Sequence, residues 1–187
     1  THGGYQVGIH HMGRLCYGIT PNDVWWATSD IGWVVGHSYI VYAPLLLGAT
    51  SIAYEGALDY PGPDMLWRLV EELGITAIFT SPTAVRLLMR YGDEPTRGAD
   101  ISSLNRLFCA GEVLNSPAWE WLQKRVLGDR IPVIDHWWQT ETGGPMIGNP
   151  FGLSMLPIKP GSAGIPLPGV EVEVMSMEGT LLPPGEK

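Results

Sequence analysis

Five short apolar runs recur along residues 24–137, and a stretch that predicts a helix separates each run from the next. The runs are rich in β-branched and aromatic side chains and cover residues 24–28, 50–54, 75–80, 106–110 and 133–137. Apolar side chains three and four residues apart predict helices over residues 3–17, 39–47 and 64–73, and further helices beginning at Ser81-Pro82 and Ser116-Pro117. This alternation predicts an α/β fold with a doubly wound, mostly parallel sheet flanked by helices.

The amino-acid composition changes after Asn149, where proline and glycine become more frequent. Val170-Glu171-Val172-Glu173-Val174 alternates strictly, which predicts a half-solvated strand of a small antiparallel unit. We therefore divide the chain near Gly152, into an α/β subdomain over residues 1–151 and the start of a β subdomain over residues 152–187.

Composition excludes several classes of protein. Hydrophobic residues make up 45% of the 187 and charged residues 16%, which allows a sizeable core and excludes wholesale disorder. The formal net charge is −8 and no block of five Lys or Arg occurs, which argues against a nucleic-acid surface. Cys16 and Cys109 form no CxxC pattern and no zinc spacing, so a reduced cytoplasmic compartment is the simplest interpretation.

One segment, residues 31–54, lacks charged residues and approaches the length of a membrane span. Glycine, proline and hydroxyl residues interrupt it, and Gly48-Ala49 separates a helix-like half from a β-branched half. A buried helix followed by a buried strand is the better interpretation, and we expect no membrane association.

The stretch Val133–Gly144 begins as a buried strand and ends in a polar loop with four hydrogen-bonding side chains in a row, Gln139-Thr140-Glu141-Thr142. In open α/β sheets, ligands bind at the carboxyl ends of the strands. The alternative is that Trp137 and Trp138 are core aromatics beside a turn that Glu141 caps. The complete run favours a site for a polar, charged ligand.

The segment Trp137–Gly143 resembles the adenine- and magnesium-binding motif of the AMP-forming acyl-CoA synthetases, in the form carried by acetyl-CoA synthetases of the acyl-adenylate-forming superfamily. Three further anchors follow the family's order, at Trp33–Tyr39, Ala110-Gly111-Glu112 and Trp119-Glu120-Trp121. The resemblance implies an acetate–CoA ligase that activates acetate, and propionate as well, with ATP and Mg²⁺ and then transfers the acyl group to CoA. It also implies that the last residues open a β-barrel-like subdomain.

Residue roles follow from the resemblance, position by position. It implies catalytic roles for Thr140 and Glu141, with Glu141 as the metal ligand. The implied ATP- and AMP-binding residues are Gly111, Glu112, Val113, Asp135, His136, Trp137, Trp138, Gln139 and Thr140. The implied acyl pocket consists of Trp33, Val34, Val35, Ala110 and Trp138, and the implied CoA contacts are Val35 and Asp59.

The chain departs from the family at five of these positions. Valine replaces the usual proline at 113 and the usual threonine at 35, alanine replaces valine at 110, and aspartate replaces asparagine at 59. His136 replaces a threonine, and an exposed strand-end histidine without a ligand role is an equal alternative.

Two other functions compete with this hypothesis. A non-catalytic nucleotide- or sugar-binding module would use tryptophans as stacking platforms, and Trp25, Trp67 and Trp119 would then be exposed. A Rossmann oxidoreductase would need a GxGxxG after a strand, which the sequence lacks. Both ends of the chain resemble internal positions of a longer protein, and we expect the 187 residues alone to be inactive because the family's phosphate loop and catalytic lysine match no segment here.

Overall fold

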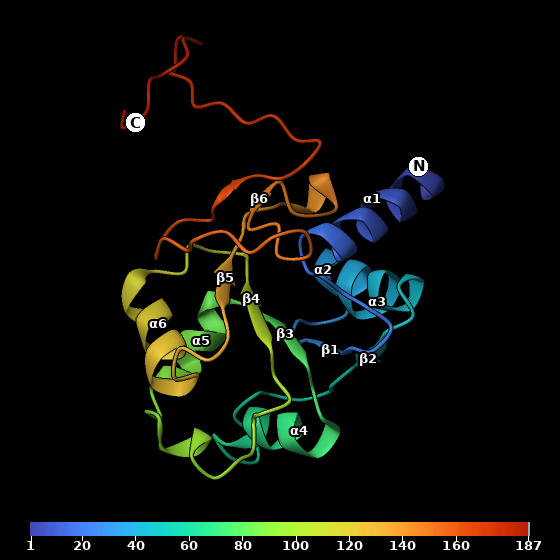
Figure 1. Ribbon diagram of the computed structural model, residues 1–187, viewed down its shortest axis with the longest axis vertical. Helices are drawn as coiled ribbons and strands as arrows, with labels where there is room; N and C mark the ends of the chain where they lie inside the picture. The colour runs from blue at the N-terminus through green and yellow to red at the C-terminus, as the bar shows by residue number, and fades with distance from the viewer. Residues whose placement is uncertain (187) are drawn as a thin grey trace.

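A five-stranded parallel sheet lies at the centre of the computed structural model, which describes residues 1–186 (Figure 1). Its strands follow the order β2-β1-β3-β4-β5. The strands are β1 (Val24–Ala27), β2 (Thr50–Ile52), β3 (Ala77–Thr80), β4 (Arg106–Cys109) and β5 (Val133–Asp135). Because the chain moves outward from β1 in both directions, the sheet is doubly wound, as predicted from the sequence.

Helical segments connect the strands and cover both faces of the sheet (Figure 1). The α-helices are α1 (His2–Leu15), α2 (Val34–Gly36), α3 (Ala43–Leu46), α4 (Met65–Leu73), α5 (Pro82–Met89) and α6 (Ser116–Glu120). Two wider π-helical segments are η1 (His37–Tyr42) and η3 (Trp121–Val126), and two short 3-10 turns are η2 (Glu94–Thr96) and η4 (Thr140–Thr142). None of the helices in residues 1–186 is both long and apolar enough to cross a bilayer.

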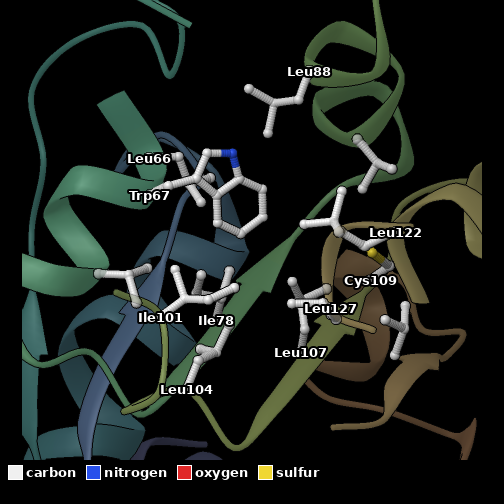
Figure 2. Packing of buried hydrophobic residues seen from close by; sticks show 14 of the residues in the cluster. Leu66, Trp67, Ile78, Leu88, Ile101, Leu104, Leu107, Cys109, Leu122 and Leu127 are labelled. Atoms are coloured by element: carbon white, nitrogen blue, oxygen red, sulfur yellow. The ribbon is translucent and has the colours of Figure 1, made fainter. Parts of the chain in front are cut away.

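Side chains alternate along each strand between two hydrophobic clusters, one on each face of the sheet. Trp26 and Ile78 point into the cluster beneath α4, α5, α6 and η3, whereas Trp25 and Phe79 point into the cluster beneath α1, η1 and α3. Figure 2 shows the first cluster, where Trp67 of α4 and Leu88 of α5 meet strand residues such as Leu107. Both faces are apolar, which explains why the strands read as continuous hydrophobic runs.

The ends of the helices follow the local sequence signals with one shift. The predicted helix start at Ser81-Pro82 is confirmed, since Ser81 Oγ accepts a 3.2 Å hydrogen bond from Ala84 N at the start of α5. Gly74 ends α4 in the left-handed conformation. The predicted helix start at Ser116-Pro117 is also confirmed, but the capping residue lies one position earlier than a serine–proline start suggests. Asn115 is the N-cap, and its Oδ1 accepts a 3.1 Å hydrogen bond from Ala118 N.

The helical segment between β1 and β2 begins earlier than its sequence predicted. It starts at Val34 rather than Tyr39 and runs without interruption to Leu46 through α2, η1 and α3. Glycine at 36 concealed this start, because glycine weakens helix propensity. Gly36 is required by packing, since a Cβ there would lie 2.6 Å from the Asp30 carbonyl oxygen.

The antiparallel unit lies elsewhere than predicted. It pairs β6 (Ile147–Gly148) with β7 (Ile165–Pro166), and residues 170–174 are not a strand. Alternation alone was misleading there, because pairing near this segment is limited, within residues 1–186, to a Met175–Leu181 bridge and a 2.9 Å hydrogen bond from Leu182 N to the Val174 carbonyl, and Val174 is exposed. The subdomain boundary near Gly152 stays a prediction.

A buried ion pair lies at the amino end of β4, opposite the end that the motifs occupy. Arg106 Nη1 donates to Asp23 Oδ1 at 3.0 Å, and both side chains are almost fully buried. Arg106 also donates to the carbonyl oxygens of Tyr17 and Gly18 at 2.8 and 3.3 Å. The pair therefore ties β4 to the segment that follows α1.

Candidate functional site

A cavity of about 580 Å³ opens at the carboxyl ends of β1, β3 and β4. The connections leave β1 and β3 in opposite directions, so this is the switch point where ligands of doubly wound sheets bind. The volume is within the range of small-molecule sites. The fold alone therefore directs attention to the edge of the sheet that carries the sequence motifs.

Nine of the predicted site residues line this cavity, although they come from three distant parts of the chain. They are Trp33, Val34, Val35, Ala110, Gly111, Glu112, Trp138, Gln139 and Thr140. Five other predicted residues do not line it: Asp59, Val113, Asp135, His136 and Trp137. Glu141 also falls outside the lining but adjoins Thr140, which is part of it.

One polar wall of the cavity was not predicted from the sequence. Thr28 and Ser29 follow β1, and Thr80 and Ser81 close β3, so two hydroxyl pairs meet at adjacent strand ends. Thr28 Oγ1 and Thr80 Oγ1 share a 2.8 Å hydrogen bond. In the sequence, each hydroxyl pair stands directly at the end of an apolar run, so each could have been noticed as a strand end. Only the pairing of β1 with β3 shows that the two hydroxyl pairs lie side by side.

The amino terminus of α5 adds partial positive charge to the same wall. Ser81 and Ala84, which lie at this end of the helix, both line the cavity. Pro82 has no N–H and the Ala84 N–H is bonded to Ser81 Oγ, so it is chiefly the helix dipole that favours a negatively charged ligand at this position. The polar end of the cavity therefore suits a phosphate or a carboxylate better than a cation.

Glu112 forms an ion pair and a hydrogen bond with two side chains of α5. Arg86 Nη2 donates to Glu112 Oε2 at 2.5 Å, and the Thr83 hydroxyl donates to Glu112 Oε1. Hydrogen bonds from Thr83 and Arg86 lower the pKa of Glu112. This exposed carboxylate consequently leaves less net negative charge at the cavity mouth.

Asp135 and His136 are buried and act behind the cavity. Asp135 Oδ2 accepts a 3.1 Å hydrogen bond from Leu114 N and so holds the loop that follows Gly111. His136 shares a 2.8 Å hydrogen bond with the Tyr17 hydroxyl, so its alternative interpretation as an exposed histidine was wrong. Burial raises the pKa of Asp135 to about 6 and lowers the pKa of His136 to about 3.

Glu141 is exposed in the short turn η4 and is free of the capping role that was its alternative. Thr142 caps this turn instead, because its Oγ1 accepts a 3.3 Å hydrogen bond from Gln139 N. Gly143 ends the turn with φ of +70°, a conformation that glycine adopts at little cost. The turn thus presents Thr140 toward the cavity and keeps the Glu141 carboxylate unengaged by other groups in residues 1–186.

Apolar side chains form the other end of the cavity. Trp138 is half-buried and packs on the cluster beneath α1, whereas Trp33 is 68% exposed at the cavity edge. Ala110 and Val35 complete this end. Asp59 lies apart from it, where its Oδ2 accepts a 3.0 Å hydrogen bond from the Tyr91 hydroxyl.

The donor set fits Mg²⁺ only in combination with a ligand. No group of three or more His, Cys, Asp or Glu side chains within residues 1–186 could hold a metal ion by itself. Mg²⁺ typically binds one or two carboxylates together with substrate phosphates and water. Glu141 can supply one such carboxylate beside a cavity whose other groups favour an anion.

Comparison with known proteins gives a consistent result. The family model described as AMP-binding enzyme matches residues 1–187. The chain is 45% identical over 185 residues to the acetyl-coenzyme A synthetase of Pyrobaculum aerophilum, covering 99% of this chain and 28% of that protein. It is 46% identical over 179 residues to the acetyl-coenzyme A synthetase of Rubrobacter xylanophilus, covering 96% of this chain and 28% of that protein.

Solved structures show the same fold. The crystal structure of a Brucella canis acyl-CoA synthetase superposes with a TM-score of 0.84 at 32% identity, covering 97% of this chain and 32% of that chain. The anthranilate CoA ligase AuaEII, in complex with anthranoyl-AMP, superposes with a TM-score of 0.83 at 23% identity, covering 97% of this chain and 33% of that chain. The chain spans about 28% of the length of the curated relatives it matches.

Proposed function

The chain belongs to the AMP-binding enzyme family, and on that premise we propose that the protein containing it activates a short carboxylic acid with ATP and transfers the acyl group to CoA. The acid is acetate, and propionate as well. Its partners are these small molecules, and its compartment is the cytoplasm.

The observation that carries this proposal is the composition of one cavity at the switch point of the sheet. One end is apolar and small, with Trp33, Ala110 and Trp138 in its lining. The other end combines hydroxyl groups with the amino terminus of α5 and therefore suits an anion. A site of this kind suits a short acyl group beside a phosphate group.

The proposed chemistry has two steps that share this cavity. In the first, a carboxylate oxygen of the acid attacks the α-phosphorus of ATP, and pyrophosphate leaves with the electron pair of the broken P–O bond. In the second, the sulfur of CoA attacks the acyl carbon, AMP leaves, and the thiol proton is released. Holding both reactants in one cavity lowers the entropic cost of each step.

We propose roles for individual residues from their positions in or beside the cavity. The Thr140 hydroxyl, in the cavity lining, binds the phosphate that reacts, and the backbone at Gly111 and Glu112 forms a wall for the adenine ring. Trp138 limits the length of the acyl group. Glu141 would hold Mg²⁺ jointly with the phosphates, and the ion would supply charge neutralisation there. For Val113, Asp135, His136, Trp137 and Asp59, contact with a substrate stays a prediction.

The competing function as a stacking module loses its main support. Trp25 and Trp67 are 0% and 1% exposed, and Trp119 is partly buried with its indole N–H donating to the Val133 carbonyl at 2.8 Å. Buried indoles cannot stack on a sugar or a base.

Pyrophosphate exchange in the full-length protein tests the proposed function. Radioactive pyrophosphate should enter ATP only when acetate or propionate and Mg²⁺ are present, and CoA should then yield the acyl thioester and AMP. Exchange that is absent with acids from acetate to octanoate would refute acid activation. Exchange without thioester formation would refute the second step alone.

A further inference from the structure

We propose that Ser38 and Tyr39 of η1 are positioning residues that hold the Trp138–Gly143 segment in place, Tyr39 through the Trp138 ring and Ser38 through the Gly143 carbonyl. The effect of these two residues on catalysis rests on the proposed function. Their positioning role itself is inferred from contacts between η1 and the Trp138–Gly143 segment. These contacts join residues about 100 positions apart in the sequence.

Tyr39 lies directly behind Trp138. The two rings meet edge to face, with centroids 5.5 Å apart and an interplanar angle of 81°. Tyr39 is fully buried, and Tyr17 meets it at 4.8 Å and Phe79 at 5.9 Å between centroids. Trp25 Nε1 also donates a 2.7 Å hydrogen bond to the Tyr39 carbonyl. Tyr39 is thus a fixed support against which the Trp138 indole rests.

The ring of Tyr39, rather than its hydroxyl, makes this contact. The hydroxyl oxygen is buried and has no hydrogen-bond partner within residues 1–186. Phenylalanine would therefore keep the support, whereas leucine would remove most of it. The two substitutions form a matched pair.

Ser38 fixes the far end of the same segment. Its Oγ donates a 3.4 Å hydrogen bond to the Gly143 carbonyl and shares a 2.5 Å hydrogen bond with the Tyr5 hydroxyl of α1. A Cβ on Gly143 would lie 3.3 Å from Tyr5 Cε2, so the tyrosine ring also packs close to this backbone. Gly143 follows Glu141 by two residues and ends the turn that carries it. The position of Glu141 consequently depends on Ser38.

The π-helical form of η1 explains how neighbouring residues perform both tasks. Ser38, Tyr39 and Ile40 are all buried, although three consecutive residues of an ordinary amphipathic helix would not all face the core. The wider turn reduces the angle between successive side chains. Single π-turns inside α-helices frequently mark functional positions.

Fluorine NMR of the full-length protein labelled with 5-fluorotryptophan tests the first contact without any need for activity. The resonance of Trp138 is assigned from its loss in a Trp138→Phe variant. We expect one narrow Trp138 line in the wild type and in Tyr39→Phe, and a shifted, broadened or doubled line in Tyr39→Leu. An unchanged Trp138 line in Tyr39→Leu would overturn the role of Tyr39.

Hydrogen–deuterium exchange tests the second contact. Ser38→Ala should speed exchange of the Thr142 and Gly143 amides by roughly threefold to tenfold, the effect of losing one hydrogen bond. Tyr5→Phe keeps the ring and the Ser38 hydroxyl and is the control, with a smaller change expected. Equal exchange in Ser38→Ala and wild type would refute the role of Ser38.

Kinetic measurements on the full-length protein then distinguish a positioning role from a general loss of structure. Tyr39→Leu should raise kcat/KM for butyrate relative to propionate by about tenfold, since one extra methylene in an apolar pocket discriminates by roughly 10-fold to 200-fold. Ser38→Ala should raise the Mg²⁺ concentration for half-maximal exchange and leave the chain-length profile unchanged. A uniform loss with every acid and every Mg²⁺ concentration would contradict positioning. A wild type that activates no acid would refute the proposed function, while the two spectroscopic results would still decide the contacts.

Discussion

Replacing Arg106 with methionine tests how much the buried ion pair with Asp23 contributes to the stability of the fold. Removing the guanidinium leaves an ionised Asp23 that is 5% exposed, with only hydrogen bonds from Thr20 and Thr76 to stabilise its charge. Breaking such a pair on one side typically costs about 3–5 kcal/mol. With a urea m-value of roughly 2 kcal/mol/M, the midpoint should fall by about 2 M.

The pH dependence of this loss provides an independent check. Burial acts to raise the pKa of Asp23, but hydrogen bonds from Arg106 and Thr76 outweigh it and lower the pKa. In the wild type, the stability from this lowered pKa is present above the ordinary aspartate pKa and is lost as pH falls through the lowered value. In Arg106→Met, burial should raise the pKa of Asp23 above its ordinary value. As pH falls, Asp23 of the variant therefore becomes protonated, which removes the free-energy cost of burying its charge. The difference between the two proteins should therefore shrink from pH 7 to pH 4.5.

Urea denaturation followed by tryptophan fluorescence measures both effects, in the 187-residue chain and in the full-length protein. Arg97→Met is the control, because Arg97 forms exposed ion pairs with Asp93 at 3.1 Å and with Glu94 at 2.5 Å, and the loss of such exposed pairs should barely change the urea midpoint. The double variant Asp23→Asn with Arg106→Met should regain part of the loss. A cost below about 1 kcal/mol for Arg106→Met, or a cost independent of pH, would refute the reasoning.

Three further predictions concern single positions. Glu141→Gln in the full-length protein should slow acid-dependent pyrophosphate exchange by ~100-fold and raise its Mg²⁺ requirement, and an unchanged Mg²⁺ dependence would exclude a metal role for Glu141. Trp138→Gly should move the maximum of kcat/KM, measured from acetate to octanoate, toward longer acids, and parallel profiles would show that Trp138 does not face the acyl group. Gly152→Ala should destabilise the fold by about 3 kcal/mol or more in urea, because a Cβ there would lie 1.8 Å from the Arg14 carbonyl oxygen; Gly98→Ala, which meets nothing within 4 Å, is the control and should be nearly neutral.

The sequence was sufficient for the fold because its signals are local and repeated. Trp25-Trp26 could be recognised as a strand buried on both faces, and Ser81-Pro82 as a helix start, from their immediate neighbours. Residues 170–174 show the limit of such reasoning. They alternate as a strand does, yet a strand needs a partner, and no residue within that pentapeptide reveals whether one exists.

Residues of the candidate site could be predicted where they form a contiguous motif. Residues that meet only through the fold could not be predicted. Trp138, Gln139 and Thr140 lie together in the sequence and in the cavity. Thr28 and Thr80 lie 52 residues apart and meet only because β1 pairs with β3. His136 belongs to the motif by position, but its direction depends on strand register, which turns its ring toward Tyr17. Tertiary pairing, rather than residue type, decides these cases.

The strand order β2-β1-β3-β4-β5 has a consequence for how the chain is made. Once β1 has emerged from a ribosome, β2 adds to one of its edges and β3 to the other, and β4 and β5 then extend the β3 side. Each new strand joins a free edge, and none has to be inserted between two earlier ones. Since synthesis presents the strands in chain order, this sheet can grow in the order of translation. The walls supplied by β1, β3 and β4 would then be in place before the loop bearing Thr140 is synthesised.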